Sequence, residues 1–516
     1  MQHAIADQDL DEYLNGDFGS FSALIAHWGK VRGTAIAIDD GDIRLTWAEL
    51  ADQVERLAAR LQADGLARGQ AVAILGTSNA GYAVSFLAAV RAGGCAAPLT
   101  TSASADQLVA MVADSGAMHL FIDAAKHAEL GDILLPAERQ IALEALDSYM
   151  APAGTIAAPV EPAADDPFNI IYSSGTTGTP KGIIHSHGMR WRQMAYRAAQ
   201  NYGANSRTIT STPLYSNTTM AVFLPSLFSG GSVSIMGKFD AQKWLERASA
   251  EGATHTMLVP VQYRRLLQHP DFDSYDLSAM RLKYCTSAPF SADLKAEALA
   301  RFPGGLIEIY GMTEGGLVCL LVAHEHPDKL HTVGQPAPGH QLKVIDEAGA
   351  ELPPGVAGEL VGRSPTMMSG YKNQPEKTAE GYWYDPADNS RWQRMGDIGR
   401  MDADGFVELV ERTKDVIISG GFNIYPVDLE NALLGDARVA EAAVVGAPSD
   451  AWGETPVGFV VLHAGVDASA LEDIRSIANA QLGKTQRLSA LHAIDEMPRS
   501  HIGKLLKTEL RAGLTG

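Results

Sequence analysis

The stretch IIYSSGTTGTPKGIIHSHG, residues 170–188, decides how the rest of the chain is interpreted. It places a loop rich in glycine and hydroxyl groups between an apolar run and a segment of helical character. Packing gives no reason for this composition, but phosphate oxygens accept hydrogen bonds from bare backbone N–H groups and Ser/Thr hydroxyls. The nucleotide-binding pattern G-x-x-x-x-G-K-[ST] does not fit, because Pro180 precedes Lys181 and Gly182 follows it. The stretch therefore predicts a phosphate-binding loop of another kind.

Length and composition indicate a multi-domain globular protein. A chain of 516 residues is too long for one compact core, so two to four domains are expected. Apolar residues make up 46% and charged residues 20%, which is ordinary for globular proteins. The formal charge of −20 argues against a general nucleic-acid or anionic-membrane surface, so an anionic ligand needs a local basic pocket.

Cysteine usage and the N-terminus favour a cytoplasmic protein. Cys95, Cys285 and Cys319 are far apart and lack metal-ligand spacing, which is typical of structural thiols in a reducing compartment. The first 18 residues are acidic and show no secretory signal. No apolar run is long enough to span a bilayer.

Local patterns predict alternating helices and buried strands. Thr46 and Glu49 have the form of a capping box, and apolar residues follow at helical spacing as far as Gly65, where the helix is expected to end. Residues 71–75, AVAIL, predict a buried strand, and a helix is expected over residues 79–91. The same alternation recurs around TITSTPLY, GSVSIMG and THTMLVP. It predicts a parallel α/β core with helices on both faces of the sheet.

The composition and the predicted secondary structure of the chain change towards the C-terminus. Residues 151–167, rich in Ala and Pro, predict a connector. After about Gly334, short strands with turn signals predict a smaller antiparallel element. From about Lys414, short strands mixed with helices predict a small α+β domain. No internal repeats are visible.

A second candidate site lies in EIYGMTEGG, residues 308–316, where a strand-like run ends. The ring of Tyr310 beside Gly311 could stack on a nucleobase. Thr313 and Glu314 could hold Mg²⁺ near phosphates. From this segment alone, a strand-end turn with a solvated glutamate is an equal alternative.

Two further charged stretches follow. In MGDIGRMDADGFVELVERTKDVIISGGFNIYP, residues 395–426, the carboxylate of Asp397 could accept both hydroxyls of a ribose, although such a charged segment is often a solvated linker. In MPRSHIGKLLKTEL, residues 497–510, Lys504 follows a glycine. It would share a face with Lys507 and Arg511, and the alternative is an ordinary solvated face.

Together these stretches resemble the adenylate-forming superfamily, which includes acyl-CoA synthetases, peptide-synthetase adenylation domains and beetle luciferases. YSSGTTGTPKG, YGMTEGG, GDIGRMDADGF with ERTKD, GGFNIYP and PRSHIGK match its successive motifs, and the likeness runs from the helix at Thr46 to Lys504. It is strongest for the AMP-forming acyl-CoA synthetase branch. The resemblance implies an α/β fold with an N-terminal domain over residues 1–412, made of two α/β subdomains and a small β-barrel. A small mobile α+β domain would cover residues 413–516.

The resemblance also implies two half-reactions in one site. A carboxylate attacks the α-phosphate of ATP, giving an acyl-adenylate and pyrophosphate. The C-terminal domain then swings about a hinge at Lys414, and the thiol of coenzyme A displaces AMP. ATP, Mg²⁺ and coenzyme A are the implied cofactors and co-substrates, and a homodimer is possible.

Site residues carry over motif by motif. Three are implied to be catalytic: Lys504 bridges the carboxylate and the α-phosphate, Thr313 touches the α-phosphate, and Glu314 binds Mg²⁺. The residues implied to bind the β- and γ-phosphates are Ser173, Ser174, Gly175, Thr176, Thr177, Gly178, Thr179 and Lys181. The residues implied to hold the adenine are Ser287, Ala288, Tyr310 and Gly311. Asp397 and Arg412 are implied to hold the ribose, and Gly420 and Gly421 the pantetheine arm.

The acyl pocket is expected to be lined by Tyr215, Ser216, Met220, Ser287, Gly315 and Gly316. Ser216 stands where amino-acid-activating relatives carry aspartate. An α-ammonium group would therefore be buried unpaired, at a cost of roughly several kcal/mol, and an amino-acid substrate is disfavoured. The lining favours an aromatic or medium-chain apolar carboxylic acid. The alternatives are a long-chain fatty acid–CoA ligase, an enzyme that loads a separate carrier protein, a luciferase-like oxidase and a non-catalytic binding protein.

Two groups of histidines invite a metal interpretation. His185 and His187 are expected instead to fix the exit of the phosphate loop into the following helix. His324, His326 and His331 resemble a zinc cluster by count, but the proline and charges around them favour a solvated loop.

Overall fold

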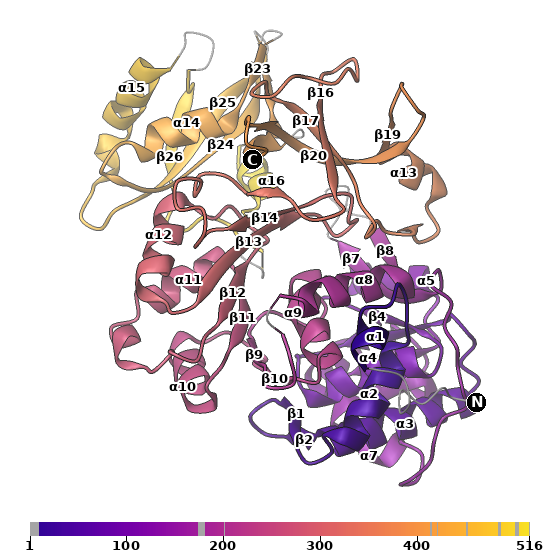
Figure 1. Ribbon diagram of the computed structural model, residues 1–516. Helices are drawn as coiled ribbons and strands as arrows, with labels where there is room; N and C mark the ends of the chain where they lie inside the picture. Colours follow the sequence, from indigo (N-terminus) through magenta and orange to yellow (C-terminus); the bar gives the residue numbers. More distant parts are fainter. Residues whose placement is uncertain are drawn as a thin grey trace. The chain divides into compact units, whose positions relative to one another are not determined.

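The computed structural model describes residues 10–173, 181–200, 202–412, 415–419, 422–449, 452–482, 487–500 and 505–514. The chain divides into two compact units. The first contains residues 1–330, 337–340 and 363–393, and the second contains residues 331–336, 341–362 and 394–516. Both units combine helices with sheets, and the predicted α/β fold class is confirmed (Figure 1).

One sheet of the first unit has the strand order β18-β8-β7-β4-β3-β5-β6. The strands from β7 to β6 in this order are parallel to their neighbours, whereas β8 is antiparallel to both β7 and β18. The strands are β3 (Ala71–Leu75), β4 (Cys95–Pro98), β5 (His119–Ile122), β6 (Gln140–Ala142), β7 (Pro167–Ser173), β8 (Lys181–Ser186) and β18 (Gly370–Tyr371). Helices near this sheet include α3 (Trp47–Ala63), α4 (Ala80–Arg91), α5 (Ala105–Ser115), α6 (Ala124–Leu130), α7 (Leu146–Tyr149) and α8 (His187–Ala198).

Both faces of this sheet are covered, as the apolar run AVAIL predicts. All five residues of β3 are buried. Val72 and Ile74 join one apolar core with residues of α3 and α4, while Ala73 and Leu75 join another with Leu108 and other residues of α5. Successive side chains of a strand point to opposite faces, so one short strand contributes to two cores.

The second sheet of the first unit has the order β14-β13-β12-β11-β9-β10-β1-β2. Its central strands, from β13 to β1, are parallel, and β14 and β2 are antiparallel to their neighbours. The strands are β1 (Ile36–Asp39), β2 (Arg44–Thr46), β9 (Arg207–Thr210), β10 (Ser232–Ile235), β11 (His255–Leu258), β12 (Leu282–Cys285), β13 (Gly305–Gly311) and β14 (Val318–Val322). The remaining helices of the unit are α1 (Leu10–Leu14), α2 (Phe21–Val31), α9 (Asn217–Phe228), α10 (Ala241–Glu251), α11 (Pro260–Leu267), α12 (Ala292–Arg301) and α13 (Pro375–Glu380).

The helix predicted after Thr46 is confirmed, together with its cap. The hydroxyl of Thr46 accepts the backbone N–H of Glu49, and the carboxylate of Glu49 accepts the backbone N–H of Thr46. These bonds satisfy two N–H groups that a helix terminus leaves without partners. The helix ends at Ala63, and Gly65 follows with a φ of +89°, a value that glycine adopts without strain.

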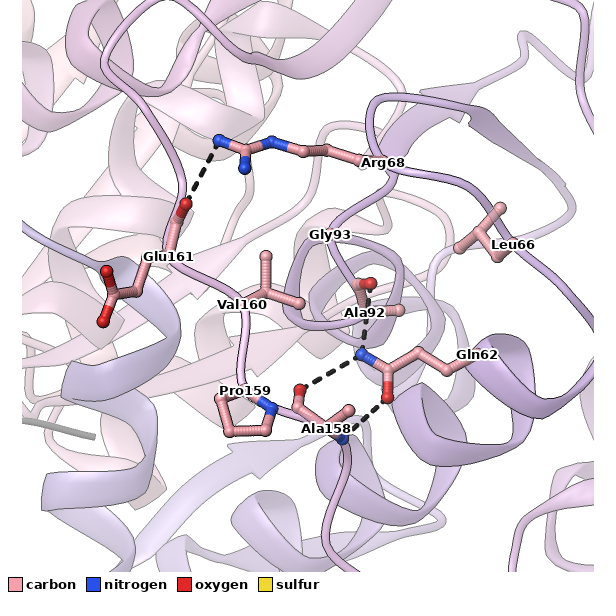
Figure 2. A pocket seen from close by; sticks show the side chains of 9 residues that line it. All are labelled: Gln62, Leu66, Arg68, Ala92, Gly93, Ala158, Pro159, Val160 and Glu161. Carbon is pink, nitrogen blue, oxygen red and sulfur yellow. Dashed lines mark hydrogen bonds between the residues drawn. The ribbon is translucent and has the colours of Figure 1, made fainter. Parts of the chain in front are cut away.

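The predicted connector, residues 151–167, is part of the first unit and is hydrogen-bonded to it near α3. Figure 2 shows Gln62 of α3 hydrogen-bonded to both backbone groups of Ala158, and Arg68 donating to the carbonyl of Glu161. Val160 faces Gly93, where a Cβ would lie 3.0 Å from the valine side chain. A surface cavity of about 420 Å³ lies here, lined by Gln62, Leu66, Arg68, Ala92, Gly93, Ala158, Pro159, Val160 and Glu161. None of these is a predicted site residue.

The second unit begins with the antiparallel element expected after Gly334. Its strands form a curled half-barrel in the order β16-β17-β20, with β21 also paired to β20. At the other end of β20, residues 391–393 pair with β19 within the first unit. The strands of the half-barrel are β16 (Gln341–Ile345), β17 (Gly358–Arg363), β20 (Arg391–Met401) and β21 (Val407–Arg412). Strand β19 (Tyr382–Tyr384) belongs to the first unit, and β15 (Gln335–Pro336) lies in the second unit outside this half-barrel.

The C-terminal part of the second unit is the predicted small α+β fold. Its sheet has the order β23-β22-β25-β24, and β26 pairs with β25 in parallel. A core that includes Leu429, Val444, Val460 and Ile474 joins this sheet to two helices. The elements are β22 (Ile417–Ser419), β23 (Phe422–Ile424), α14 (Pro426–Leu434), β24 (Val439–Ser449), β25 (Gly453–Leu462), α15 (Leu471–Gln481), β26 (Ala490–Ala493) and α16 (Lys507–Ala512). Within the described ranges, no helix is long and apolar enough to cross a membrane.

Candidate active site

The predicted site residues divide into those that the structure describes and those outside it. Ser173 and Arg412 are described as members of strands β7 and β21, but not their side chains. The predicted residues outside the described ranges are Ser174, Gly175, Thr176, Thr177, Gly178, Thr179, Lys414, Gly420, Gly421 and Lys504. The geometry below therefore concerns the described end of the phosphate loop, at Lys181, and the motifs that surround it.

The turn that carries Thr313 and Glu314 is held by backbone and side-chain bonds from β8, from the segment before β18 and from β18 itself. His185 lies 2.8 Å, through Nε2, from the carbonyl oxygen of Thr313. The carbonyl of Glu314 accepts the N–H of Met368 at 2.8 Å, and its side chain accepts a hydrogen bond from the hydroxyl of Tyr371, 2.7 Å from Oε1. Glu314 is thus a half-buried, hydrogen-bonded carboxylate rather than a freely solvated one.

Lys181 lies beside the same tyrosine. Its ammonium nitrogen is 5.3 Å from the centre of the Tyr371 ring, which is cation–π distance. Tyr371 pairs with Ile183 in the β18–β8 ladder, and Lys181 is two residues away from Ile183 on β8. Residues two apart share a face of a strand, so the ladder brings Lys181, Tyr371 and the Glu314 carboxylate together.

A buried polar network supports this arrangement behind His185. Arg190 of α8 is fully buried, and its guanidinium contacts His185 Nδ1 at 2.8 Å and Asn169 Oδ1 at 2.8 Å. It also donates to Asn217, the first residue of α9, at 2.9 Å. A guanidinium can only donate, so Nδ1 of His185 accepts, and Nε2 carries the proton that is donated to Thr313.

The electrostatics agree with this assignment. Burial lowers the pKa of His185 well below its ordinary value, and the charge of Arg190 lowers it further, so the imidazole is neutral. Burial also lowers the pKa of Arg190 to about 9. The network therefore carries its charge on Arg190 and presents a neutral N–H to the Thr313 carbonyl. His185 and His187 were predicted to fix the exit of the loop into the following helix, but the sequence gave no sign of Arg190, because helical arginines are usually exposed.

The strand ends that carry Tyr310 and Ser287 are joined directly. The hydroxyl of Thr286 donates to the carbonyl of Ile309 at 2.7 Å, which ties the end of β12 to β13. Ser287 has a φ of +80°, a conformation that residues other than glycine rarely adopt, and its hydroxyl is 2.7 Å from that of Thr218. Such strain is kept where the surroundings hold a residue in place, and it often marks functional sites.

The predicted acyl-pocket residues have distinct surroundings. Ser216 is the N-cap of α9, where its hydroxyl accepts the N–H of Thr218 at 3.2 Å. Met220 is buried in the largest apolar core. Gly315 has a φ of +76°, and a Cβ there would collide with the carbonyl oxygen of Thr366. Thr218 was not among the predicted site residues, and no local pattern signals its contact with Ser287.

In the second unit, the Asp397 motif forms a two-stranded ladder. Asp397 on β20 is directly opposite Arg412 on β21. Asp397 is buried, with 7% of its surface exposed. Lys507 of α16 lies 2.9 Å from Glu430 and 3.6 Å from Glu411, with a side chain that is only 12% exposed. The alternative of an ordinary solvated face is therefore wrong for Lys507.

The histidines suspected as metal ligands do not gather into a site in the described part of the chain. No three His, Cys, Asp or Glu side chains of those residues lie together as a metal ion would need. His324 instead contacts both backbone groups of Leu306 through Nδ1, at 3.1 and 3.2 Å. His187 is the first residue of α8, and its ring packs edge-on against Phe168.

Two regions of the chain match known protein families. Residues 25–372 match the profile described as AMP-binding enzyme, and residues 428–504 match the one described as AMP-binding enzyme C-terminal domain. The chain belongs to the AMP-binding enzyme family. This AMP-binding enzyme falls in the AMP-forming acyl-CoA synthetase branch, the acid–thiol ligases of the adenylate-forming superfamily, which confirms the resemblance seen in the sequence.

Individual relatives cover nearly all of the AMP-binding enzyme. It is 34% identical over 490 residues to a feruloyl-CoA synthase from an Amycolatopsis species, covering 92% of this chain and 95% of that protein. It is 31% identical over 501 residues to an indoleacetate–CoA ligase from Aromatoleum aromaticum, covering 93% and 94%. Among solved structures, it is similar to o-succinylbenzoate coenzyme A synthetase from Bacillus subtilis in complex with ATP and magnesium ion. The identity is 25%, the TM-score is 0.82, and 96% of this chain and 99% of that one are covered.

Proposed function

We propose that the protein is an ATP-dependent, AMP-forming carboxylic acid–CoA ligase whose acid is aromatic or a medium-chain apolar acid. The observation that carries the proposal is the meeting of Lys181, Tyr371 and Glu314 at the end of the phosphate loop. A cation and a carboxylate fixed beside a donor-rich loop suit the binding of a metal–triphosphate complex.

The first unit would bind most of the nucleotide. Loop residues 173–181 would hold the β- and γ-phosphates, and Thr313 the α-phosphate. The ring of Tyr310 would stack on adenine beside the backbone of Ser287 and Ala288. The hydrogen bond between Thr286 and Ile309 supports this assignment, because it fixes the ends of β12 and β13, and fixed strand ends can position a ligand.

A magnesium ion fits the residues at Glu314. Oε1 of Glu314 accepts the Tyr371 hydroxyl, and Oε2 makes no hydrogen bond or ion pair with a residue that the structure describes. One carboxylate together with substrate phosphates is a usual way for proteins to bind Mg²⁺. The ion would neutralise phosphate charge and orient the triphosphate.

Other residues proposed to act on the nucleotide and the acid belong to the second unit. Asp397 and Arg412, opposite each other in the β20–β21 ladder, would bind the ribose. Lys504 would bridge the substrate carboxylate and the α-phosphate. We place the boundary between the N-terminal and C-terminal domains between residues 412 and 413. Lys414 would then act as the hinge of a mobile C-terminal domain. Residues 420 and 421 would line the pantetheine tunnel.

The proposed reaction has two displacement steps. A carboxylate oxygen attacks the α-phosphorus of ATP, and the bond to pyrophosphate breaks, which gives an acyl-adenylate. The thiolate of coenzyme A then attacks the acyl carbon, and the bond to AMP breaks. The first step joins two anions, so donors and cations that meet the developing charge on the phosphate supply the main stabilisation.

The acid is proposed from the relatives and the pocket residues. The two relatives above act, by their names, on ferulate and indoleacetate, both aromatic acids. Ser216 supplies no charge for an ammonium group, and its hydroxyl already caps α9. These observations support a neutral, flat acyl group rather than an amino acid.

The test is a panel of acids assayed for pyrophosphate exchange and for AMP formation that depends on coenzyme A. Aromatic acids should be the best substrates, and Lys504→Ala should nearly abolish exchange while thioester formation from supplied acyl-AMP remains. A carrier protein with phosphopantetheine serves as the rival thiol acceptor. If no acid gives labelled ATP from radioactive pyrophosphate, or if acetate is the best acid, the proposal is wrong.

A further inference from the structure

Tyr371 occupies a position that no sequence motif brought to notice. It is the second residue of the two-residue strand β18, in a segment that returns to the first unit after the chain has entered the second. Its backbone N–H donates to the hydroxyl of Thr378 at 2.9 Å, and it pairs with Ile183 on β8. The backbone of Tyr371 is therefore fixed on both sides.

The side chain of Tyr371 contacts two charged residues of the candidate site, Glu314 and Lys181. Its hydroxyl donates to Glu314 Oε1 at 2.7 Å, and its ring lies under the Lys181 ammonium at 5.3 Å. Burial and the neighbouring carboxylate raise the pKa of Tyr371 well above its ordinary value, so the phenol keeps its proton and acts as the donor. Tyr371 therefore contacts both the carboxylate and the ammonium group.

We propose that Tyr371 is a positioning residue that holds the Glu314 carboxylate for the metal and seats Lys181 for the triphosphate. The proposal rests on the proposed function, and it deepens it by naming the group that aligns the two. A glutamate side chain has three rotatable bonds, and a hydrogen bond from a fixed phenol selects one arrangement of them. Partners of this kind typically change metal affinity or activity by about 10–100-fold when removed.

Two substitutions separate the two contacts. Tyr371→Phe removes the hydroxyl but keeps the ring over Lys181, whereas Tyr371→Leu removes both. Binding of ATP to the full-length protein is measured by calorimetry with and without Mg²⁺, in the absence of any acid. For Tyr371→Phe we expect affinity with Mg²⁺ to fall by about tenfold and affinity without Mg²⁺ to stay near that of the wild type.

For Tyr371→Leu we expect the loss seen for Tyr371→Phe with Mg²⁺ and a further loss of about 2–5-fold both with and without Mg²⁺, because Lys181 loses the aromatic face. Tyr384→Phe is the matched control, since Tyr384 is 49% exposed on β19 and should leave both affinities unchanged. Thermal unfolding of each variant is recorded in parallel, so that a change in folding is seen separately.

The outcomes are distinct from those that test the proposed function. If Tyr371→Phe keeps the full gain in affinity that Mg²⁺ gives the wild type, or loses affinity equally with and without the ion, the positioning role is wrong. Failure of the wild type to catalyse pyrophosphate exchange would instead contradict the proposed function. Binding of ATP and its dependence on Mg²⁺ can be measured in either case.

Discussion

Substitution of Lys295 by methionine should destabilise the first unit, by an amount that grows with pH. Lys295 of α12 and Glu308 of β13 form a buried ion pair with an N–O distance of 2.5 Å, and the side chains are 2% and 7% exposed. The ammonium also donates to the carbonyl of Leu330 at 2.7 Å. Breaking a buried pair from one side leaves a charge without compensation and typically costs about 3–5 kcal/mol.

The pH dependence follows from Glu308. Burial raises the pKa of Glu308 to about 7, and the charge of Lys295 opposes that rise. When the folded pKa is above the unfolded one, the folded state holds a proton that the unfolded state releases, and stability falls as pH rises from about 4.5 through the folded pKa. In wild type this loss levels off just above pH 7. Without Lys295 the pKa of Glu308 rises further, so the loss continues to higher pH.

The difference between the variant and the wild type should therefore widen from about pH 7 to about pH 8.5. The slope is at most about 1.4 kcal/mol per pH unit, which gives up to about 2 kcal/mol over this range. For a unit of this size, a loss of about 3–5 kcal/mol lowers the melting temperature by roughly 4–7 °C. Circular dichroism melts at several pH values provide the measurement.

The matched control is the double variant Lys295→Met with Glu308→Leu. It removes both charges and replaces them with apolar side chains of similar size, so most of the lost stability should return. A melting temperature of Lys295→Met equal to that of the wild type at about pH 8.5 would refute the reasoning. A deficit that is the same at every pH would refute it as well.

Three further substitutions or conditions test other parts of the fold. Gly315→Ala should lower both the melting temperature and pyrophosphate exchange, the latter at least about tenfold, because its Cβ meets the Thr366 carbonyl; wild-type values would contradict the close approach. Lys283→Met should cost about 1–3 kcal/mol in thermal melts, because the Lys283 ammonium donates to three consecutive carbonyls after α12, and an unchanged melt would count against these bonds. Burial lowers the pKa of His185 well below its usual value and that of His187 to about 4, so unfolding takes up protons below about pH 6.5. The two rings together outweigh the opposite contribution of Glu308, so melting temperatures should fall as pH drops from about 6.5 to 5. A profile that rises over this range would contradict two buried neutral rings.

Features encoded by neighbouring residues were predictable from the sequence. The capping box of Thr46 and Glu49 depends on residues three apart, and the buried strand at 71–75 depends on an unbroken apolar run. Such signals need no knowledge of the rest of the fold. The family motifs also predicted a site at Thr313 and Glu314, but they did not predict the contacts that surround these two residues.

Contacts between distant segments were not predictable. Tyr371 and Glu314 are 57 residues apart, and they meet because residues 363–393 return to the first unit, which no local pattern signals. Arg190 lies on a helix whose sequence looks ordinary, and only the tertiary structure shows that neutral side chains surround its charge. The solvated-face alternative failed for Lys507 because its acidic partners come from other elements, β21 and α14.

The strand β8 has a consequence for engineering. Lys181, Ile183 and His185 occupy alternate positions, so they share the face that meets Tyr371 and the Thr313 carbonyl. Adding or deleting one residue between Lys181 and His185 would turn one of the two towards the opposite face. The number of residues from Lys181 to His185 is therefore fixed. The apolar side chains at positions 183 and 184, in contrast, should be replaceable by other aliphatic ones.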